Sequence, residues 1–173
     1  MKNLLVSLTL ILGVSLAAFA NQQLVDYCTQ TGGEVVPEWT CPATGSVKMG
    51  EACKQKNSSG QEMYFNGCSA PEGKYKNLFF KACIVHDLCY HHEPTTNNKS
   101  KADCDNTFLA DMKKICKAIN PLSLECGIVA QTYYAAVANA GDAAFSCSKE
   151  NVNYPPSMDQ LPLPSPTPFM ANY

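Results

Sequence analysis

The sequence contains no arginine, and charged residues of any kind make up only 16% of its 173 positions. Its lysines are outnumbered by aspartate and glutamate, 13 against 15, which gives a formal net charge of −2 at pH 7. A nucleic-acid-binding surface needs concentrated positive charge to neutralise phosphates, so this composition argues against a DNA or RNA partner. Because 46% of the residues are hydrophobic, the chain has enough apolar surface for one folded core, which excludes a disordered acidic protein.

Long apolar runs are absent after residue 20. Residues 1–20 combine one cation at Lys2, an apolar stretch, and the small-x-small pattern Ala18-Phe19-Ala20, after which a signal peptidase cuts. The apolar stretch is interrupted by serine and threonine and is shorter than the ~20 residues that a bilayer-spanning helix needs. We therefore predict that residues 1–20 are a secretory signal peptide, and that the secreted chain has no transmembrane segment.

Cysteine pairs separated by two residues, a common sign of a zinc site, are also absent. The chain nevertheless has ten cysteines, and thiols oxidise outside the cell. We predict disulfides rather than a cysteine-based metal site. Two glycosylation sequons, at Asn57 and Asn98, are typical of exposed loops in a secreted glycoprotein.

Composition divides the secreted part into one domain, residues 21–150, and a tail, residues 151–173. From residue 21 to about 73 the chain is rich in glycine, proline, threonine, serine and cysteine, and only residues 33–36 favour a strand. We interpret this region as loop held by disulfides. The tail contains six prolines, which neither continue a helix nor fit a central strand, so we predict that it is extended and mobile.

Three helices are expected in the rest of the domain. Apolar residues recur every three or four positions from about Asn77 to His92, the period of one helix face. Ser100 is suited to cap a second helix. The carboxylate of Asp103 is placed to hydrogen-bond back to the cap residue and to interact favourably with the positive end of the helix dipole. A third apolar segment, from Ile128 to about Ser146, is interpreted as a helix that Gly141 divides.

The segment from Cys83 to Tyr90 carries the clearest chemical signal, because it places an imidazole, a carboxylate and a phenol between two cysteines. At ~100° per residue, His86 and Asp87 lie in neighbouring sectors of a helix, and Tyr90 returns to the side of His86. A proton-accepting imidazole and a carboxylate suited to a hard cation such as Ca²⁺ are therefore expected to face one cavity.

A second carboxylate, Asp105, follows Cys104 on the next predicted helix. If Cys89 joined Cys104, Asp105 would be held near His86. Buried against one ring nitrogen, the carboxylate would fix the imidazole tautomer and leave the other nitrogen free to take a proton. Asp105 is alternatively an ordinary solvated acid on the helix surface, and the residues alone leave both interpretations open.

A turn-forming loop precedes the first helix. Gly67 permits a tight turn and Asn66 offers a side-chain amide. If Cys68 joined Cys83, this loop would lie beside the start of the helix, where its carbonyl groups would complete a cation site with Asp87.

The other charged groups near these motifs have structural interpretations. We interpret His91 and His92, at the end of the first helix, as cations that interact favourably with the negative end of its dipole. Lys113, Lys114 and Lys117 are interpreted as a solvated face, with anionic lipid headgroups as the alternative contact.

The pattern Cys-x-x-His-Asp-x-Cys-Tyr at residues 83–90, followed by the pair Cys104-Asp105, resembles the active-site helices of the secreted phospholipase A2 superfamily. The loop at residues 66–69 is most similar to the compact bacterial, fungal and conodipine-like branch. The resemblance covers residues 66–116, about a third of the chain. It implies a mainly α, disulfide-rich fold in which two long antiparallel helices carry the site, with a third helix and a loop-rich N-terminal region.

The resemblance also implies two disulfides, which are Cys68–Cys83 and Cys89–Cys104. The remaining six cysteines allow 15 pairings, and the sequence does not choose among them.

The implied function is a secreted, monomeric, calcium-dependent hydrolase of the sn-2 ester of glycerophospholipids, acting on a membrane surface. His86 would be the general base that activates water, Asp105 would orient His86, and Tyr90 would hydrogen-bond Asp105. Ca²⁺ would be held by Asp87, Asn66 and Gly67. The apolar residues Leu78, Phe79 and Phe80 would line the opening for lipid.

Two departures from the family pattern lead to a second hypothesis. Vertebrate and venom members have paired cysteines before the histidine, whereas Ala82 precedes Cys83 here. In the bacterial enzymes a carboxylate occupies the position that aligns with Asn66, so a neutral amide would weaken the calcium site. The alternative is therefore a catalytically weak or inactive phospholipase A2-like binding protein or toxin.

Overall fold

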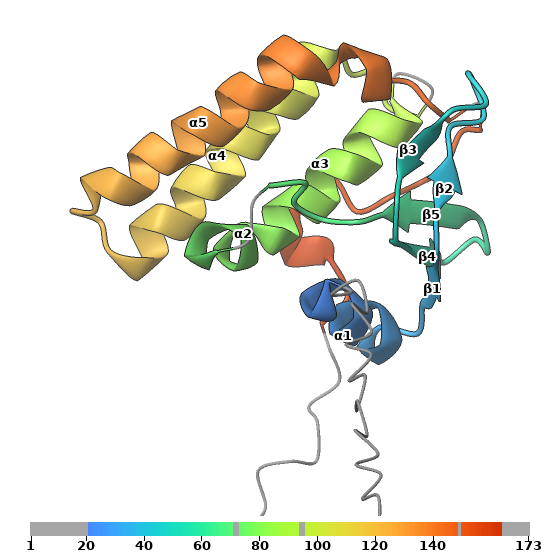
Figure 1. Ribbon diagram of the computed structural model, residues 1–173, viewed down its shortest axis with the longest axis horizontal. Helices are drawn as coiled ribbons and strands as arrows, with labels where there is room; N and C mark the ends of the chain where they lie inside the picture. Colours follow the sequence, from blue (N-terminus) through green and yellow to red (C-terminus); the bar gives the residue numbers. More distant parts are fainter. Residues whose placement is uncertain (1–20, 71–72, 94–95, 149, 164–173) are drawn as a thin grey trace, which may run out of the picture.

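The computed structural model describes residues 21–70, 73–93, 96–148 and 150–163. The predicted signal peptide, residues 1–20, lies outside these ranges. Three helices lie side by side on one side of the molecule, and two small sheets with a further helix lie on the other (Figure 1). None of the described helices is both long and apolar enough to cross a membrane.

The three expected helices are present with shifted ends. The first begins as a short helix, α2 (Lys74–Leu78), and continues after one residue as α3 (Phe80–His92). The second is α4 (Lys101–Ile119), and the predicted cap is confirmed, because the Ser100 side chain accepts from the backbone N–H of Asp103 while the Asp103 carboxylate accepts from that of Ser100. The third, α5 (Leu124–Ala140), ends at the predicted glycine, where the 3₁₀ helix η1 (Gly141–Ala144) follows.

The strand favoured at residues 33–36 is present, but the rest of the N-terminal region has more regular structure than the loop that we expected. It contains α1 (Gln22–Gln30) and five short strands. A three-stranded antiparallel sheet has the order β1 (Glu34–Val36), β4 (Ala52–Lys56), β5 (Glu62–Phe65), and β2 (Trp39–Thr40) pairs with β3 (Val47–Met49). The strands have two to five residues each, so an alternating pattern has no room to develop in the sequence.

Five disulfides join the elements to one another, and no described cysteine is free. Two of them are the pairs that the resemblance implies. The five pairs are Cys28–Cys53, Cys41–Cys147, Cys68–Cys83, Cys89–Cys104 and Cys116–Cys126. The third, fourth and fifth pairs link the loop before α2 to α3, α3 to α4, and α4 to α5, so the helices that carry the site are fixed to one another.

Residues 151–163 have little regular secondary structure, but the prediction that this part of the C-terminal tail is mobile is wrong. Val152, Tyr154 and Leu161 are buried in the main core with α1 and α3. A 3₁₀ turn, η2 (Met158–Gln160), lies between the last two of them. Proline is disfavoured inside helices and in central strands, but it does not prevent neighbouring apolar side chains from packing on a surface. Residues 164–173 lie outside the described ranges.

Glu93, directly after α3, anchors this returning segment. Its fully buried carboxylate accepts hydrogen bonds from the Tyr154 hydroxyl (2.7 Å), from the backbone and side chain of Asn97 (2.8 and 2.7 Å) and from the Lys99 N–H (3.0 Å). Burial raises the pKa of Glu93, but these donors outweigh it and bring the pKa below its ordinary value. The carboxylate therefore connects the α3–α4 loop to the C-terminal segment.

The interpretation of His91 and His92 as dipole cations is also wrong. Both side chains are buried, and burial lowers the pKa of His91 to about 3 and that of His92 to about 4, so both are neutral at pH 7. The His91 ring lies 4.5 Å from the Trp39 ring, and its Nδ1 lies 3.1 Å from the Tyr64 carbonyl oxygen. The sheet region covers the end of α3, which the sequence of the helix does not reveal.

Replacing Tyr154 with phenylalanine should destabilise the protein by about 1–3 kcal/mol, because Glu93 would stay buried with one donor fewer. Urea unfolding with the disulfides intact measures the loss. Tyr134→Phe is the matched control, since the Tyr134 hydroxyl makes an exposed 3.4 Å contact with Asn106, and we expect a change within about 0.5 kcal/mol. Equal losses in both variants would contradict this role of Glu93.

The neutral state of His91 predicts a stability that depends on pH. Its pKa is lower in the folded than in the unfolded state, so the unfolded chain takes up the proton first as the pH falls. This contribution is complete above about pH 6.5 and is lost toward pH 3, by at most about 1.4 kcal/mol per pH unit. His91→Gln should therefore flatten the dependence of the urea midpoint on pH between 7 and 5. An unchanged slope would show that His91 is not the group responsible.

Candidate active site

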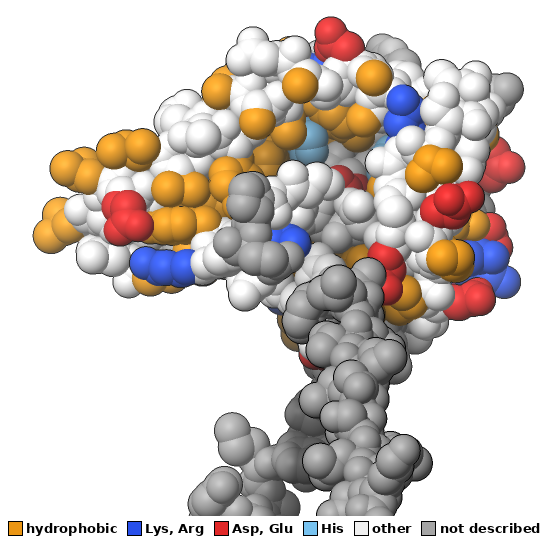
Figure 2. All heavy atoms as spheres, in the orientation of Figure 1, with side chains coloured by type: hydrophobic (Ala, Val, Ile, Leu, Met, Phe, Trp, Pro, Cys, Tyr) orange, Lys and Arg blue, Asp and Glu red, His pale blue; other side chains and the backbone are white. Residues whose placement is uncertain are grey.

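A cavity of about 370 Å³ opens between α3, α4, α5 and the loop at residues 66–70. Histidine atoms are visible in a hollow on the face drawn in Figure 2. Five of the six predicted catalytic and metal-binding residues line the cavity, namely Asn66, Gly67, His86, Asp87 and Tyr90. The sixth, Asp105, is bonded to His86.

His86 is held between two aromatic rings. Tyr90, one helical turn further along α3, has its ring centre 4.0 Å from that of His86, and Phe108 of α4 approaches to 4.6 Å. His86 and Tyr90 therefore lie on the same side of α3, as their spacing of four residues predicts. These contacts leave the imidazole little freedom to rotate, so its nitrogens keep fixed directions.

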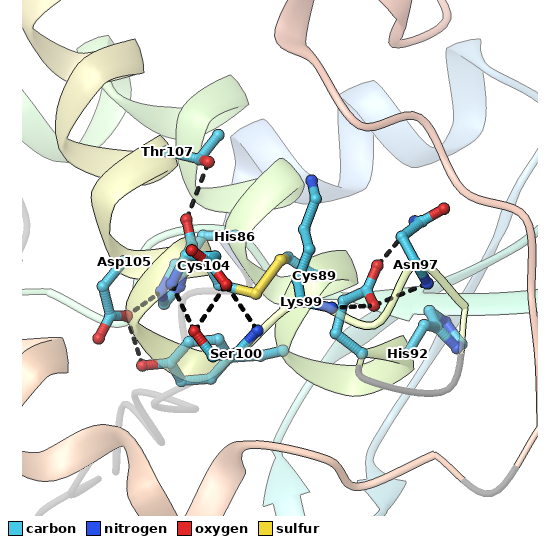
Figure 3. Close-up of a disulfide and its surroundings, with 12 residues drawn as sticks. His86, Cys89, His92, Asn97, Lys99, Ser100, Cys104, Asp105 and Thr107 are labelled. Atoms are coloured by element: carbon cyan, nitrogen blue, oxygen red, sulfur yellow. Dashed lines mark hydrogen bonds and ion pairs between the residues drawn. A yellow bond between two sulfur atoms is a disulfide. The ribbon is translucent and has the colours of Figure 1, made fainter.

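Asp105 is buried, with 2% of its surface exposed, which excludes the interpretation as a solvated surface acid. Its Oδ1 lies 2.9 Å from His86 Nε2 (Figure 3). The same oxygen accepts a hydrogen bond from the Tyr90 hydroxyl at 2.6 Å. An ionised carboxylate only accepts hydrogen bonds, so Nε2 carries the imidazole proton and Nδ1 is left unprotonated. The Cys89–Cys104 disulfide next to this pair fixes α3 against α4.

Lys101 is a member of the site that our sequence analysis missed. Its Nζ donates to Asp105 Oδ2 at 3.1 Å and to the Ala138 carbonyl oxygen at 2.9 Å, and Asp142 lies 3.5 Å away. Lys101 therefore neutralises the buried carboxylate and ties it to the end of α5. The sequence signal for this contact was the spacing of four residues between Lys101 and Asp105 on one helix.

Burial and the neighbouring polar groups together set the protonation states of His86 and Asp105. For Asp105, burial raises the pKa, but the hydrogen bonds from His86, Tyr90 and Lys101 outweigh it and the pKa falls below its ordinary value. For His86, burial lowers the pKa, Asp105 opposes this shift, and the net pKa is lowered. The pair at pH 7 is thus a neutral imidazole next to a carboxylate.

Asp87 faces the loop at the start of the cavity. Its Oδ2 accepts from the backbone N–H groups of Asn66 and Gly67, both at 2.9 Å. Burial raises the pKa of Asp87 to about 7 in spite of these two donors. Gly67 has φ +77°, and an added Cβ would lie 2.5 Å from the Phe80 ring, so no other residue fits this turn without strain.

The residues around Asp87 fit a hard cation held mainly by neutral oxygens. Within the described ranges, no group of three or more His, Cys, Asp or Glu side chains is placed to hold a metal, and Asp87 is the one carboxylate among the cavity residues. Ca²⁺ accepts carboxylate, amide, backbone and water oxygens in flexible geometry. The backbone N–H groups of Asn66 and Gly67 donate to Asp87, and all three residues line the same cavity. The side-chain and backbone oxygens that these residues carry are of the kind that a weak Ca²⁺ site uses.

Gly141 is a second residue whose importance the sequence did not reveal. An added Cβ at this position would overlap the Tyr90 hydroxyl. The glycine that ends α5 therefore also makes room for the phenol that reaches Asp105.

The prediction that Leu78, Phe79 and Phe80 line the opening is wrong. Phe79 and Phe80 are buried in the core, and Leu78 and Phe80 border a separate groove of about 760 Å³. The apolar cavity wall comes instead from α4 and α5, through Phe108, Tyr133, Ala136 and Val137.

The comparisons with known proteins agree with this geometry. A model of the family described as prokaryotic phospholipase A2 matches residues 39–141, which include all the site residues above. Conodipine-P1, Conodipine-P2 and Conodipine-P3 of Conus purpurascens are each 40% identical to the chain over 62 residues, which is 35% of this chain. The matched segment spans 34% of each conodipine, about a third of its length.

No solved structure matches the chain significantly. The family model covers more than half of the chain and extends from β2 to the first residue of η1. It includes the disulfide-linked helices and both members of the His86–Asp105 pair. The conodipine matches confirm the resemblance to the conodipine-like branch. The chain therefore belongs to the prokaryotic phospholipase A2 family.

Proposed function

We propose that the protein is a secreted, calcium-dependent phospholipase A2 that hydrolyses the sn-2 ester of glycerophospholipids. The observation that carries this proposal is the buried His86–Asp105 pair beside a cavity whose wall is largely apolar. All the proposed catalytic residues come from one chain, so the proposed active unit is the monomer.

His86 is proposed as the general base. Nδ1, unprotonated in the tautomer that Asp105 selects, takes a proton from water, and the water oxygen forms a bond to the ester carbonyl carbon. When the carbon–oxygen bond to the glycerol breaks, the same nitrogen returns the proton to the departing oxygen. Asp105 stabilises the imidazolium that exists between these two steps, and Tyr90 and Lys101 hold Asp105 in place.

The cavity residues have distinct proposed roles. Asp87, with Asn66 and Gly67, would hold Ca²⁺, which when bound supplies positive charge to polarise the ester carbonyl and to attract the lipid phosphate. Phe108, Tyr133 and neighbouring aliphatic groups would contact the acyl chain and exclude water.

The second hypothesis, a phospholipase A2-like binding protein with little turnover, is favoured by one observation. The proposed cation site has a single carboxylate, and the side chain of Asn66 is neutral. Hydrolysis of phospholipid vesicles, measured with and without a chelator, separates the two functions. Calcium-dependent release of fatty acid supports the enzyme.

Secretion is supported by the pairing of all ten cysteines. The two sequons differ in their exposure to a glycosylating enzyme. The Asn57 amide nitrogen donates to Gln61 and to the Asn153 carbonyl oxygen, whereas Asn98 is exposed. Asn98 is therefore the proposed glycan site.

Replacing His86 with glutamine should lower kcat for vesicle hydrolysis by at least about 100-fold, because the base that activates water is lost. His92→Gln is the matched control, since His92 is buried outside the cavity, and it should retain activity if it folds. Circular dichroism verifies folding of both variants. Most of the turnover surviving in His86→Gln would rule out the proposed mechanism.

The raised pKa of Asp87 predicts that calcium affinity depends on pH. The carboxyl group is ionised above about pH 7 and protonated below it, and a proton competes with the cation. Calorimetric titration should give a Kd on the order of 10⁻⁴–10⁻³ M at pH 8, weakening by up to about tenfold per pH unit below 7. Asp87→Asn should remove binding, whereas Asp26→Asn on α1 should not. Equal affinity at pH 8 and pH 5.5 would contradict the assignment.

A further inference from the structure

The turn between α4 and α5 exposes large apolar side chains that the proposed mechanism does not use. Four residues, which we call the hairpin patch, are each between 61% and 85% exposed: Ile119, Leu122, Leu124 and Ile128. They make up four of the six exposed large hydrophobic residues in the described part of the chain. Hydrophobic side chains gather at this end of the molecule, on the face that shows the histidine hollow (Figure 2). Grouped exposure of this kind indicates a contact surface.

The turn is held in one conformation. The Cys116–Cys126 disulfide joins α4 to α5 across it. The backbone N–H groups of Leu122 and Ser123 donate to the side chain and the carbonyl oxygen of Asn120, respectively, at 3.0 Å. The apolar side chains are therefore presented outward on a rigid turn, and little backbone entropy is lost when they are covered.

The hairpin patch is continuous with the cavity along α5. Leu124, Ile128, Thr132 and Ala136 are spaced four residues apart, which places them in one row on the helix surface. The first two belong to the hairpin patch, and the last two line the cavity. The row extends for roughly 18 Å at ~1.5 Å per residue, so a partner that covers the hairpin patch also lies near the cavity opening.

Charge around the turn favours an anionic partner. Lys113 and Lys117 are exposed on the last turns of α4, and Glu125 is the one acidic residue between them and the end of the hairpin patch. Lysines next to an inserted apolar group attract the anionic headgroups of a bilayer.

We propose that the hairpin patch inserts into the surface of an anionic phospholipid membrane and holds the cavity over the lipid. This inference rests on the proposed function, because the substrate of that reaction is a component of the same membrane. Leu122 and Leu124 are the main inserting groups, and Lys117 contacts the headgroups.

The test measures binding separately from hydrolysis. The double variant Leu122→Ser/Leu124→Ser and the control Leu163→Ser are sedimented with vesicles of a non-hydrolysable diether phosphatidylglycerol. Leu163 is 77% exposed and lies outside the hairpin patch. Affinity should fall about 100-fold in the double variant, roughly tenfold for each leucine, and less than about twofold in the control. Lys117→Gln should weaken binding to these vesicles more than to diether phosphatidylcholine vesicles.

A second assay uses a short-chain phospholipid dissolved as monomers. The double variant should hydrolyse it as fast as the unaltered protein, because the cavity residues are intact, while hydrolysis of vesicles falls with the binding. If no form of the protein hydrolyses the dissolved lipid, the proposed function fails, whereas the loss of vesicle binding still supports membrane insertion.

Three results would overturn the inference. The double variant binds vesicles as tightly as the unaltered protein, or it loses hydrolysis of dissolved lipid to the same extent as hydrolysis of vesicles. The third is that analytical ultracentrifugation shows the unaltered protein as a dimer and the double variant as a monomer, while the vesicle binding of the variant is unchanged. That result would assign the hairpin patch to contact with a second copy of the chain.

Discussion

The buried carboxylate of Asp105 is the group on which the arrangement of the site depends. It accepts from His86 and Tyr90 of α3 and from Lys101 of its own helix, and Lys101 in turn donates to α5. A buried carboxylate without these donors would carry a large desolvation cost. The same hydrogen bonds that offset this cost fix the tautomer of His86, so the requirement for stability and the requirement for a proton-accepting nitrogen are met by one set of contacts.

The two acids next to His86 differ in their surroundings. Asp105 has three side-chain donors, one of them cationic, and its pKa is lowered. Asp87 has two backbone donors and no cationic partner among its hydrogen bonds, and burial raises its pKa to about 7. A carboxylate with no cationic hydrogen-bond partner among the described residues is suited to an external cation. The opposite shifts therefore separate the group that orients the imidazole from the group proposed to hold Ca²⁺.

Much of this site was predictable from the sequence, because most of its residues lie on α3 and α4, where residue spacing determines which side chains share a side of the helix. The spacing of four residues between His86 and Tyr90 predicted that they share one side of the helix. The capping residue Ser100 predicted where α4 begins. The direction of Asp105 was not predictable from its own helix, since burial depends on what packs against it. The same reason explains His91 and His92, which were predicted to be cations at the helix end. The sheet region covers His91, and Tyr154 of the C-terminal segment packs near His92.

The missed elements of the fold have different physical causes. Leu24, Tyr27 and Cys28 do repeat at helical spacing on α1, but the glycines and prolines that follow masked this signal. The strands are too short to show alternation. In the C-terminal segment, the prolines concealed anchors such as Val152 and Tyr154, whose role depends on contacts with α3 and its following loop.

The Cys89–Cys104 disulfide links the proposed activity to an oxidising compartment. The imidazole and its orienting acid lie on different helices, and this covalent link beside them forms only under oxidising conditions. Within the reducing cytosol of the producing cell, the chain would lack the bond that fixes the two helices in register. For a protein with the proposed phospholipase activity, export would complete the site and would spare the membranes of the cell that makes it.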